Sequence, residues 1–216
     1  MSDSFKGYVL REGEGGKVTG AFEEVATADL PDGDVTVRVA YSTVNYKDGM
    51  VMNGIGRLVR KYPHVPGVDF SGTVETSSHP GLAPGDPVVL TGWRVGETRW
   101  GGYAVLARVP GDYLVKLPSG LSLERAMALG TAGFTAGLAV DSLEAAGMRP
   151  DGGEVLVTGA SGGVGSVAVA LLAAKGYTVV ASTGRAETHD YLKELGAASI
   201  VDRAEFAEQP KRPLAS

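Results

Sequence analysis

The chain contains no cysteine and only three histidines, and these absences exclude several kinds of site. Without thiols there is no disulfide framework and no thiolate zinc site, so a reducing, cytoplasmic location is the default expectation. His64, His79 and His189 lack the short spacing of a metal-binding motif. We therefore expect a protein that works without a metal ion.

Positive charge and long apolar runs are also scarce. The net charge is -5, and no basic stripe is interleaved with aromatic residues, so we expect no nucleic-acid partner. No uninterrupted apolar run approaches the roughly 18 residues of a membrane span, and the N-terminal residues do not resemble a signal peptide, so we expect no membrane partner. With 216 residues, of which 44% are hydrophobic, the sequence indicates a globular protein of one or two domains.

A glycine-rich turn in residues 155–176 (VLVTGASGGVGSVAVALLAAKG) is the most informative motif. It lies between an apolar strand and a helix of small residues. Glycines at such a turn allow the backbone to approach a pyrophosphate, which the N-H groups of the helix then face. The first glycine of a strict G-x-G-x-x-G pattern is replaced by Ala160, so an ordinary strand-to-helix turn is the alternative interpretation.

The flanking residues favour a dinucleotide site. A second apolar strand is predicted at residues 177–181, a helix at 190–195 and a third strand from residue 199. Alternation of strands and helices predicts a doubly wound parallel sheet, in which helices cover the strands.

The end of the second strand predicts NADPH as the cofactor. An acidic residue there would bind the ribose 2'-hydroxyl of NADH, but residues 176–186 contain none. Ser182, Thr183 and Arg185 instead suit a 2'-phosphate, because hydroxyls and a guanidinium bind phosphate oxygens. The alternative is that Arg185 is an ordinary surface residue.

The first 120 residues predict a compact all-β unit. Short strands at 35–40, 68–74, 87–90 and 103–109 are separated by Gly, Pro and Asp turns. Two helices, 122–128 and 134–146, are predicted to follow, with a break at residues 130–133.

Several segments together resemble the medium-chain dehydrogenase/reductase superfamily, and in particular its zinc-free quinone-oxidoreductase-like branch, which contains acryloyl-CoA reductases. The matching segments are 44–48 (VNYKD), 63–74 (PHVPGVDFSGTV), 90–96 (LTGWRVG), 100–103 (WGGY), 126–136 (AMALGTAGFTA) and 157–167 (VTGASGGVGSV).

The resemblance implies a fold of the α/β plus all-β class. A GroES-like β domain at residues 1–121 would carry the substrate, and residues 122–216 would form connecting helices and the first half of a Rossmann domain. It also implies NADPH-dependent reduction of an α,β-unsaturated acyl-CoA, acryloyl-CoA to propionyl-CoA. The protein would orient the alkene and stabilise the enolate on the thioester oxygen. Reduction of quinones or other enones is the alternative activity.

The resemblance also implies site residues. Tyr46 would contact the nicotinamide end of the cofactor or donate to the developing oxyanion, and Asn45 would be a second donor; a core aromatic is the alternative for Tyr46. Lys47 and Asp48, adjacent and oppositely charged, are interpreted first as a local structural pair, with a proton-handling role as the alternative.

Cofactor residues are implied at three places in the second half of the chain. The pyrophosphate would lie on Ser161, Gly162, Gly163 and Val164, and the adenosine phosphate near Ser182, Thr183, Gly184 and Arg185. Arg203, after the third strand, would also reach the cofactor unless it is an ordinary surface arginine. Trp93 and Trp100 flank a glycine-rich loop near the family's cleft, and at least one is expected to pack in the β domain.

The sequence departs from the family in length. Only about 60 residues follow position 151, which is room for three strands of a sheet that has about six in this fold. We therefore expect that the C-terminal third is missing. The chain would be a fragment of an active reductase, a short form whose sheet another copy or chain completes as an oligomer, or an inactive nucleotide-binding or interaction module.

Overall fold

The computed structural model describes residues 3–206, and contacts divide the chain into two compact units, Met1–Thr131 and Ala132–Ser216. The domain boundary proposed after residue 121 lies in front of helix α2 (Leu123–Ala145), whereas this division falls inside that helix. The start of α2 belongs to the first unit because the Ser71 hydroxyl donates to the Leu123 carbonyl at 2.8 Å.

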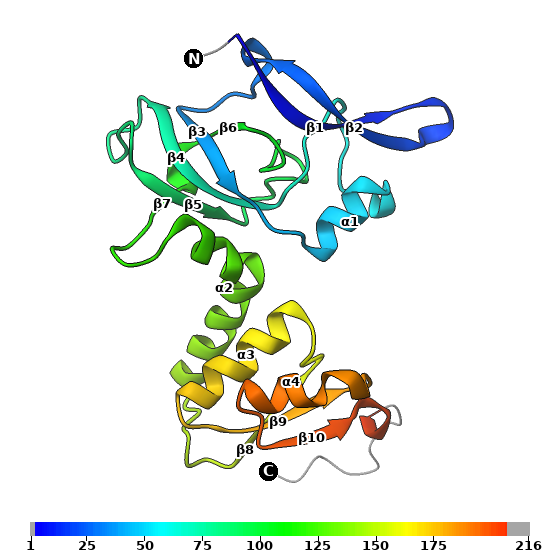
Figure 1. Cartoon of the computed structure of the whole chain (residues 1–216), viewed down its shortest axis with the longest axis vertical. Coiled ribbons are helices and arrows are strands. Elements are labelled where there is room, and N and C mark those ends of the chain that lie inside the picture. Colours follow the sequence, from blue (N-terminus) through cyan, green and yellow to red (C-terminus); the bar gives the residue numbers. More distant parts are fainter. Residues whose placement is uncertain (1–2, 207–216) are drawn as a thin grey trace. The chain divides into compact units, whose positions relative to one another are not determined.

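The first unit contains a five-stranded antiparallel sheet in the order β6-β3-β4-β5-β7 (Figure 1). Its strands are β3 (Val35–Tyr41), β4 (Asp69–Ser77), β5 (Pro87–Thr91), β6 (Leu106–Val109) and β7 (Val115–Lys116). Phe70, Val35 and Val88 are fully buried in its core. The three predicted strands at 35–40, 68–74 and 87–90 are confirmed, while the fourth begins at Leu106 rather than at residue 103.

A hairpin of two nine-residue strands, β1 (Ser4–Glu12) and β2 (Val18–Ala26), was not predicted from the sequence. Most side chains of β2 are exposed, and Phe22 is 81% exposed, so the strand lacks the apolar and polar alternation that marks a half-buried strand. Helix α1 (Tyr46–Met52) was not predicted either. Short 3-10 turns lie at Glu14–Gly16, Thr27–Asp29, Ile55–Arg57, Gly111–Tyr113, Ala186–Thr188 and Arg203–Phe206.

Helix α2 consists of two helical segments joined at Gly130, which agrees with the break predicted at residues 130–133. Gly130 has φ 53° and ψ -157°, which is far from helical backbone and strained for any residue with a side chain. A Cβ atom built on Gly130 would also lie 3.1 Å from the Cγ2 atom of Thr43.

By length and composition alone, α2 qualifies as a membrane-spanning helix, with a mean hydropathy of 1.2 in its most apolar window. A helix packed in a protein core meets the same criteria. The kink at Gly130 interrupts α2, and Ala136 and Val140 are buried against protein. Only 28% of that window is buried among the described residues, and a single helix of this kind is weak evidence for a membrane span.

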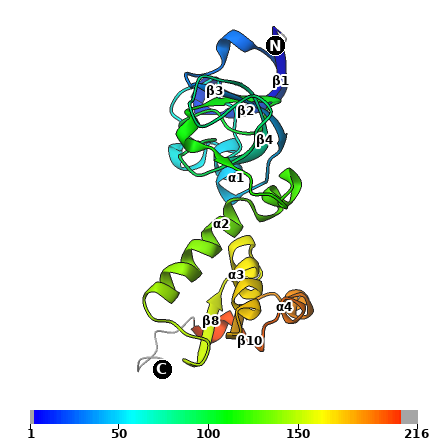
Figure 2. The same cartoon turned by 90° about the vertical axis from the view of Figure 1, so that its left-hand side faces the viewer.

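The second unit contains a three-stranded parallel sheet in the order β10-β9-β8 (Figure 2). The elements are β8 (Glu154–Thr158), α3 (Gly163–Ala174), β9 (Thr178–Thr183), α4 (His189–Glu194) and β10 (Ser199–Asp202), which confirms the predicted alternation. Two crossovers in the same direction along a sheet place α3 and α4 on one side of it. Among the described residues β8 is an edge strand, and its Leu156 is 37% exposed.

Burial of His64 predicts a loss of stability in mild acid. His64 is 2% exposed, its Nε2-H donates to the Gly96 carbonyl at 2.9 Å, and burial lowers its pKa below 6.5. The unfolded chain therefore binds a proton more readily than the folded chain as the pH falls through 6.5. The free energy of unfolding should decrease by up to about 1.4 kcal/mol per pH unit below that point.

Urea unfolding at pH 7.5 and 5.5 checks this. We expect the free energy of unfolding of His64→Gln to change less between the two pH values than that of the parent chain. The control is His189→Gln, which replaces a histidine that is only partly buried and should show the same change as the parent chain. Equal pH dependence in the parent and in His64→Gln would contradict the prediction.

Candidate functional site

The glycine turn of the second unit connects β8 to α3 through a close backbone approach. A Cβ atom on Gly165 would lie 2.7 Å from the Cα atom of Ala160, so the first turn of the helix packs against the turn only because Gly165 has no side chain. The Ala160 N-H donates to the Ser182 carbonyl at 3.1 Å, which ties the turn to β9.

The predicted pyrophosphate residues lie at the N-terminus of α3. Gly162, Gly163 and Val164 are exposed, and Ser161 is partly buried. Gly162 is the N-cap and has no side chain to accept hydrogen bonds from the first-turn N-H groups. These N-H groups, with the positive end of the helix dipole, suit an anion.

Strand β9 extends two residues beyond its predicted end, so Ser182 and Thr183 lie inside it and are 2% and 4% exposed. The hydroxyls of Thr183 and Ser161 are 3.0 Å apart and hydrogen-bonded, which joins β9 to the glycine turn. The Thr183 hydroxyl also accepts from the Arg185 N-H at 3.2 Å. These hydroxyls hold the shape of the strand end, and Arg185 remains exposed.

Arg203 lies directly over Gly184. A Cβ atom on Gly184 would be 2.7 Å from Nε and 2.9 Å from Cδ of Arg203, so the arginine stem packs on the bare backbone. Arg203 follows β10, and the carboxyl ends of parallel strands share one edge of the sheet. Within residues 3–206, neither Arg185 nor Arg203 forms an ion pair with a carboxylate. The edge therefore presents two unpaired cations beside the glycine turn.

The predicted substrate-side residues lie where α1 begins in the first unit. Tyr46, the first residue of the helix, is 86% exposed, which excludes the core-aromatic interpretation. The Asn45 side-chain nitrogen donates to the Thr43 hydroxyl at 2.8 Å and to Asp69 Oδ2 at 3.1 Å. Both amide hydrogens of Asn45 are thus engaged within the protein, whereas the Tyr46 hydroxyl is exposed.

Lys47 and Asp48 do not pair with each other, so the interpretation of the two as one local structural pair was wrong. Consecutive helical residues face different directions. Lys47 Nζ pairs with the buried Glu97 at 2.8 Å. Asp48 is fully buried and accepts from the N-H groups of Asn45 (2.8 Å), Gly67 (3.0 Å) and Val68 (3.1 Å).

The pKa of Asp48 is raised because burial disfavours its charge, although its hydrogen bonds to Asn45 and Val68 act in the opposite direction. The side chain contacts backbone donors rather than the exposed surface of the site. Its geometry is that of a structural residue.

Asp69, at the start of β4, was missed by the sequence analysis. Its fully buried carboxylate accepts from the backbone N-H and hydroxyl of Thr43, from the Asn45 amide, and from the backbone N-H and hydroxyl of Thr131. A carboxylate inside an apolar strand, as in VDFSG, is the signal that could have identified it, because a buried charge requires donors.

The two tryptophans have different environments. Trp100 packs against the cluster that contains Phe5 and Val9, and its indole N-H donates to the Pro63 carbonyl at 3.2 Å. Trp93 is 56% exposed and stacks on Tyr113, with ring centroids 4.4 Å apart. The expectation that at least one tryptophan packs in the β domain is confirmed.

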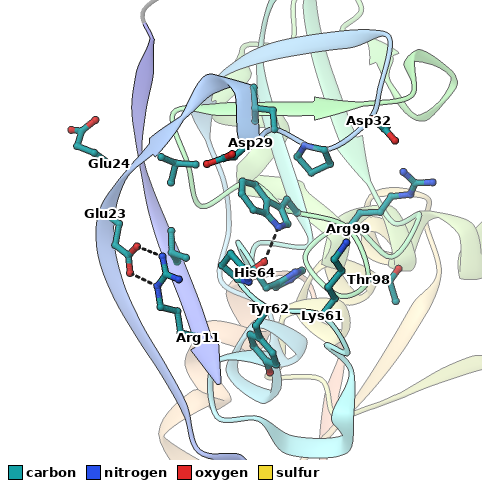
Figure 3. Close-up of a pocket in the computed structure, with 16 residues that line it drawn as sticks. Arg11, Glu23, Glu24, Asp29, Asp32, Lys61, Tyr62, His64, Thr98 and Arg99 are labelled. Atoms are coloured by element: carbon teal, nitrogen blue, oxygen red, sulfur yellow. Dashed lines mark hydrogen bonds and ion pairs between the residues drawn. The ribbon is translucent and has the colours of Figure 1, made fainter. Parts of the chain in front are cut away.

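A hollow of about 830 Å³ lies elsewhere in the first unit, beside the β1-β2 hairpin (Figure 3). Its rim carries the Arg11–Glu23 ion pair, at 2.7 Å, and the side chain of Lys61. Trp100 is among its lining residues, but none of the predicted catalytic or cofactor-binding residues lines it. Over residues 3–206, no group of three or more His, Cys, Asp or Glu side chains is arranged to hold a metal ion.

Comparison with known proteins identifies relatives of both units. The family described as "Alcohol dehydrogenase GroES-like domain" matches residues 31–119. The chain is 61% identical over 208 residues to acrylyl-CoA reductase AcuI of Ruegeria pomeroyi, an alignment that covers 96% of this chain and 63% of that protein.

Two solved structures share the fold. One is the yhdH oxidoreductase from Salmonella enterica in complex with NADP, with 53% identity, a TM-score of 0.93, and coverage of 98% of this chain and 64% of that chain. The other is Bacillus subtilis yhfP with NAD bound, with 45% identity, a TM-score of 0.94, and coverage of 100% and 65%. The chain thus spans less than two thirds of these relatives. The predicted fold class, a GroES-like domain followed by part of a Rossmann-like parallel sheet, is confirmed.

The close approach at Gly165 predicts that Gly165→Ala destabilises the second unit. The added methyl group would overlap the backbone at Ala160, which should lower the free energy of unfolding by about 2 kcal/mol or more. Gly137→Ala is the matched control, since a Cβ atom there meets nothing within 4 Å and alanine favours a helix by up to about 1 kcal/mol. Urea unfolding of both variants measures the difference, and equal stabilities would contradict a close contact between Gly165 and the backbone at Ala160.

Proposed function

We propose that this chain is a member of the medium-chain dehydrogenase/reductase superfamily that binds NADPH and takes part in zinc-free reduction of an α,β-unsaturated acyl-CoA. The proposed reaction converts acryloyl-CoA to propionyl-CoA. The observation that carries the cofactor assignment is the pair of arginines beside the glycine turn, Arg185 and Arg203, which form no ion pair within residues 3–206. The substrate assignment is supported by similarity to an acrylyl-CoA reductase.

The residues at the sheet edge fit a dinucleotide. The free N-H groups at the start of α3 suit the pyrophosphate, and Gly165 provides the close approach that this turn requires. Arg185 and Arg203 suit the additional phosphate of NADPH, because each offers several charged donors and has no carboxylate partner in the described chain. Ser182 and Thr183 are buried, so we assign them to shaping the strand end, and Ser161 to the same contact through Thr183.

The exposed start of α1 supports a substrate role for Tyr46. When bound, the nicotinamide cofactor supplies the two-electron reducing chemistry. The residues of this chain would orient the thioester and stabilise the negative charge that develops on its oxygen. The exposed Tyr46 hydroxyl can donate to that oxygen, whereas both hydrogens of the Asn45 amide are already used. We therefore propose Tyr46 as the contacting residue and Asn45 as its structural neighbour.

Two other functions are alternatives to the reduction of acryloyl-CoA: the reduction of quinones or other enones, and nucleotide binding without catalysis. Quinones and other enones would use the same cofactor, and no described feature of the first unit identifies a CoA pocket. Turnover of acryloyl-CoA, crotonyl-CoA and benzoquinone with NADPH separates these substrates, and faster turnover of benzoquinone would favour the quinone activity. NADPH binding without any turnover would favour a nucleotide-binding module.

The cytoplasmic location and the assembly into homo-oligomers remain predictions.

Arg185 should select NADPH over NADH. We expect Arg185→Ala to raise the Kd for NADPH at least tenfold and to change the Kd for NADH less than threefold, because only NADPH carries the 2'-phosphate. Arg125→Ala is the control, since Arg125 is also exposed and forms no ion pair within residues 3–206. Titration of both cofactors gives the constants. Tighter binding of NADH than of NADPH by the parent chain would overturn the cofactor assignment.

Tyr46→Phe removes the hydroxyl and keeps the ring. If the hydroxyl donates to the oxyanion, kcat for acryloyl-CoA should fall at least tenfold, and if it contacts the nicotinamide end, the Kd for NADPH should rise. The control is Tyr41→Phe, which changes another exposed tyrosine, at the end of β3. Steady-state kinetics and cofactor titration report the two effects, and a variant with full turnover and full NADPH affinity would rule out a role for the hydroxyl.

A further inference from the structure

We propose that Asp69 is a positioning residue, whose buried carboxylate fixes the loop that presents Tyr46. The relevance of this role to turnover rests on the proposed function, but the structural role does not. The proposal stands on the number, type and origin of the donors that surround the carboxylate.

Five donors converge on Asp69 from two distant parts of the chain. From the loop before α1, the Thr43 N-H (3.1 Å), the Thr43 hydroxyl (2.7 Å) and the Asn45 amide (3.1 Å) contribute. From the kink in α2, the Thr131 N-H (2.9 Å) and the Thr131 hydroxyl (2.6 Å) contribute. Asp69 itself is held in β4, which pairs with β3 and β5.

This set of donors suits a carboxylate, whose two oxygens offer several acceptor sites. A buried charge is costly unless hydrogen bonds compensate it, and bonds to a charged acceptor are stronger than neutral ones. An asparagine at this position would turn an NH2 group toward at least one donor. The five bonds therefore depend together on one charged side chain.

Asp69 acts on the N-terminal ends of two helical segments. Asn45 is the N-cap of α1, and Thr131 follows the non-helical Gly130 at the start of the second segment of α2. First-turn N-H groups have no acceptor inside their own helix, and a negative charge near them is favourable. Asp69 supplies that acceptor to Thr131 from a different element.

Gly130 makes this arrangement possible. Its backbone, with φ 53° and ψ -157°, would strain any residue with a side chain, and a Cβ atom there would lie in tight contact, 3.3 Å from Asp69 Oδ2 and 3.1 Å from Thr43 Cγ2. Thr43, Asn45 and Thr131 are then joined through one side chain. Tyr46 follows Asn45 directly, and the N-H of Asn45 is bound on the other side by Asp48.

The first test measures loop order by amide hydrogen exchange in residues 43–48. Thr131→Val removes one donor that is more than 80 residues from the loop in sequence. We expect at least tenfold faster exchange in the loop of Thr131→Val and of Asp69→Asn, and less than twofold change in Thr131→Ser, which keeps the hydroxyl. Ser71→Ala is the control, because it removes a different contact between β4 and α2. Unchanged loop exchange in Thr131→Val, or an equal increase in Ser71→Ala, would overturn the proposal.

The second test uses acryloyl-CoA-dependent oxidation of NADPH. We expect kcat to fall at least tenfold in Thr131→Val while the Kd for NADPH changes less than twofold, with recovery in Thr131→Ser. A parallel loss in Ser71→Ala would indicate general destabilisation and contradict a positioning role. If the parent chain shows no turnover, that result counts against the proposed function, and the exchange experiment alone decides the role of Asp69.

Discussion

The first unit depends on two buried carboxylates that gather backbone and side-chain donors from distant segments. Asp48 binds the N-H groups of Gly67 and Val68, and Asp69 binds Thr43 and Thr131. Removing a charge from water is unfavourable unless its acceptor sites are filled, so each carboxylate constrains several loops at once. The segment that carries Tyr46 lies between these two anchors, and its exposed side chain therefore extends from a fixed backbone.

The second unit depends on a different constraint, which is that glycine is needed wherever another segment packs directly on the backbone. Gly165 allows α3 to start against the turn, and Gly184 allows the Arg203 stem to lie on the end of β9. The hydrogen bond between Ser161 and Thr183 joins the two places. The result is an edge formed by free N-H groups and guanidinium groups, which can bind phosphates without a buried charge in the apo protein.

Local and distant interactions differ in how well the sequence predicts them. The glycine turn, the strands around it and the break in α2 depend on residues close together in the chain, and the sequence alone indicated them. The Lys47–Glu97 pair and the contacts of Asp69 span from 24 to 62 residues, and no local pattern reveals them. Strand β2 was missed for another reason, since its mostly exposed side chains leave little periodicity, whereas β1 does alternate between exposed and buried residues and was overlooked.

This difference also explains why the choice of cofactor rests on few residues. The pyrophosphate proposed to bind at the glycine turn is common to NADH and NADPH, and solved relatives with 53% and 45% identity hold NADP and NAD, respectively. On the proposed function, discrimination between the two cofactors comes from the charged donors at the ends of β9 and β10. A hydrogen bond to a charged group contributes about 1.5–3 kcal/mol, or roughly tenfold to hundredfold in affinity. If the proposed roles of Arg185 and Arg203 are right, these two residues can set the cofactor preference, and a substitution at either position would change it without altering the fold.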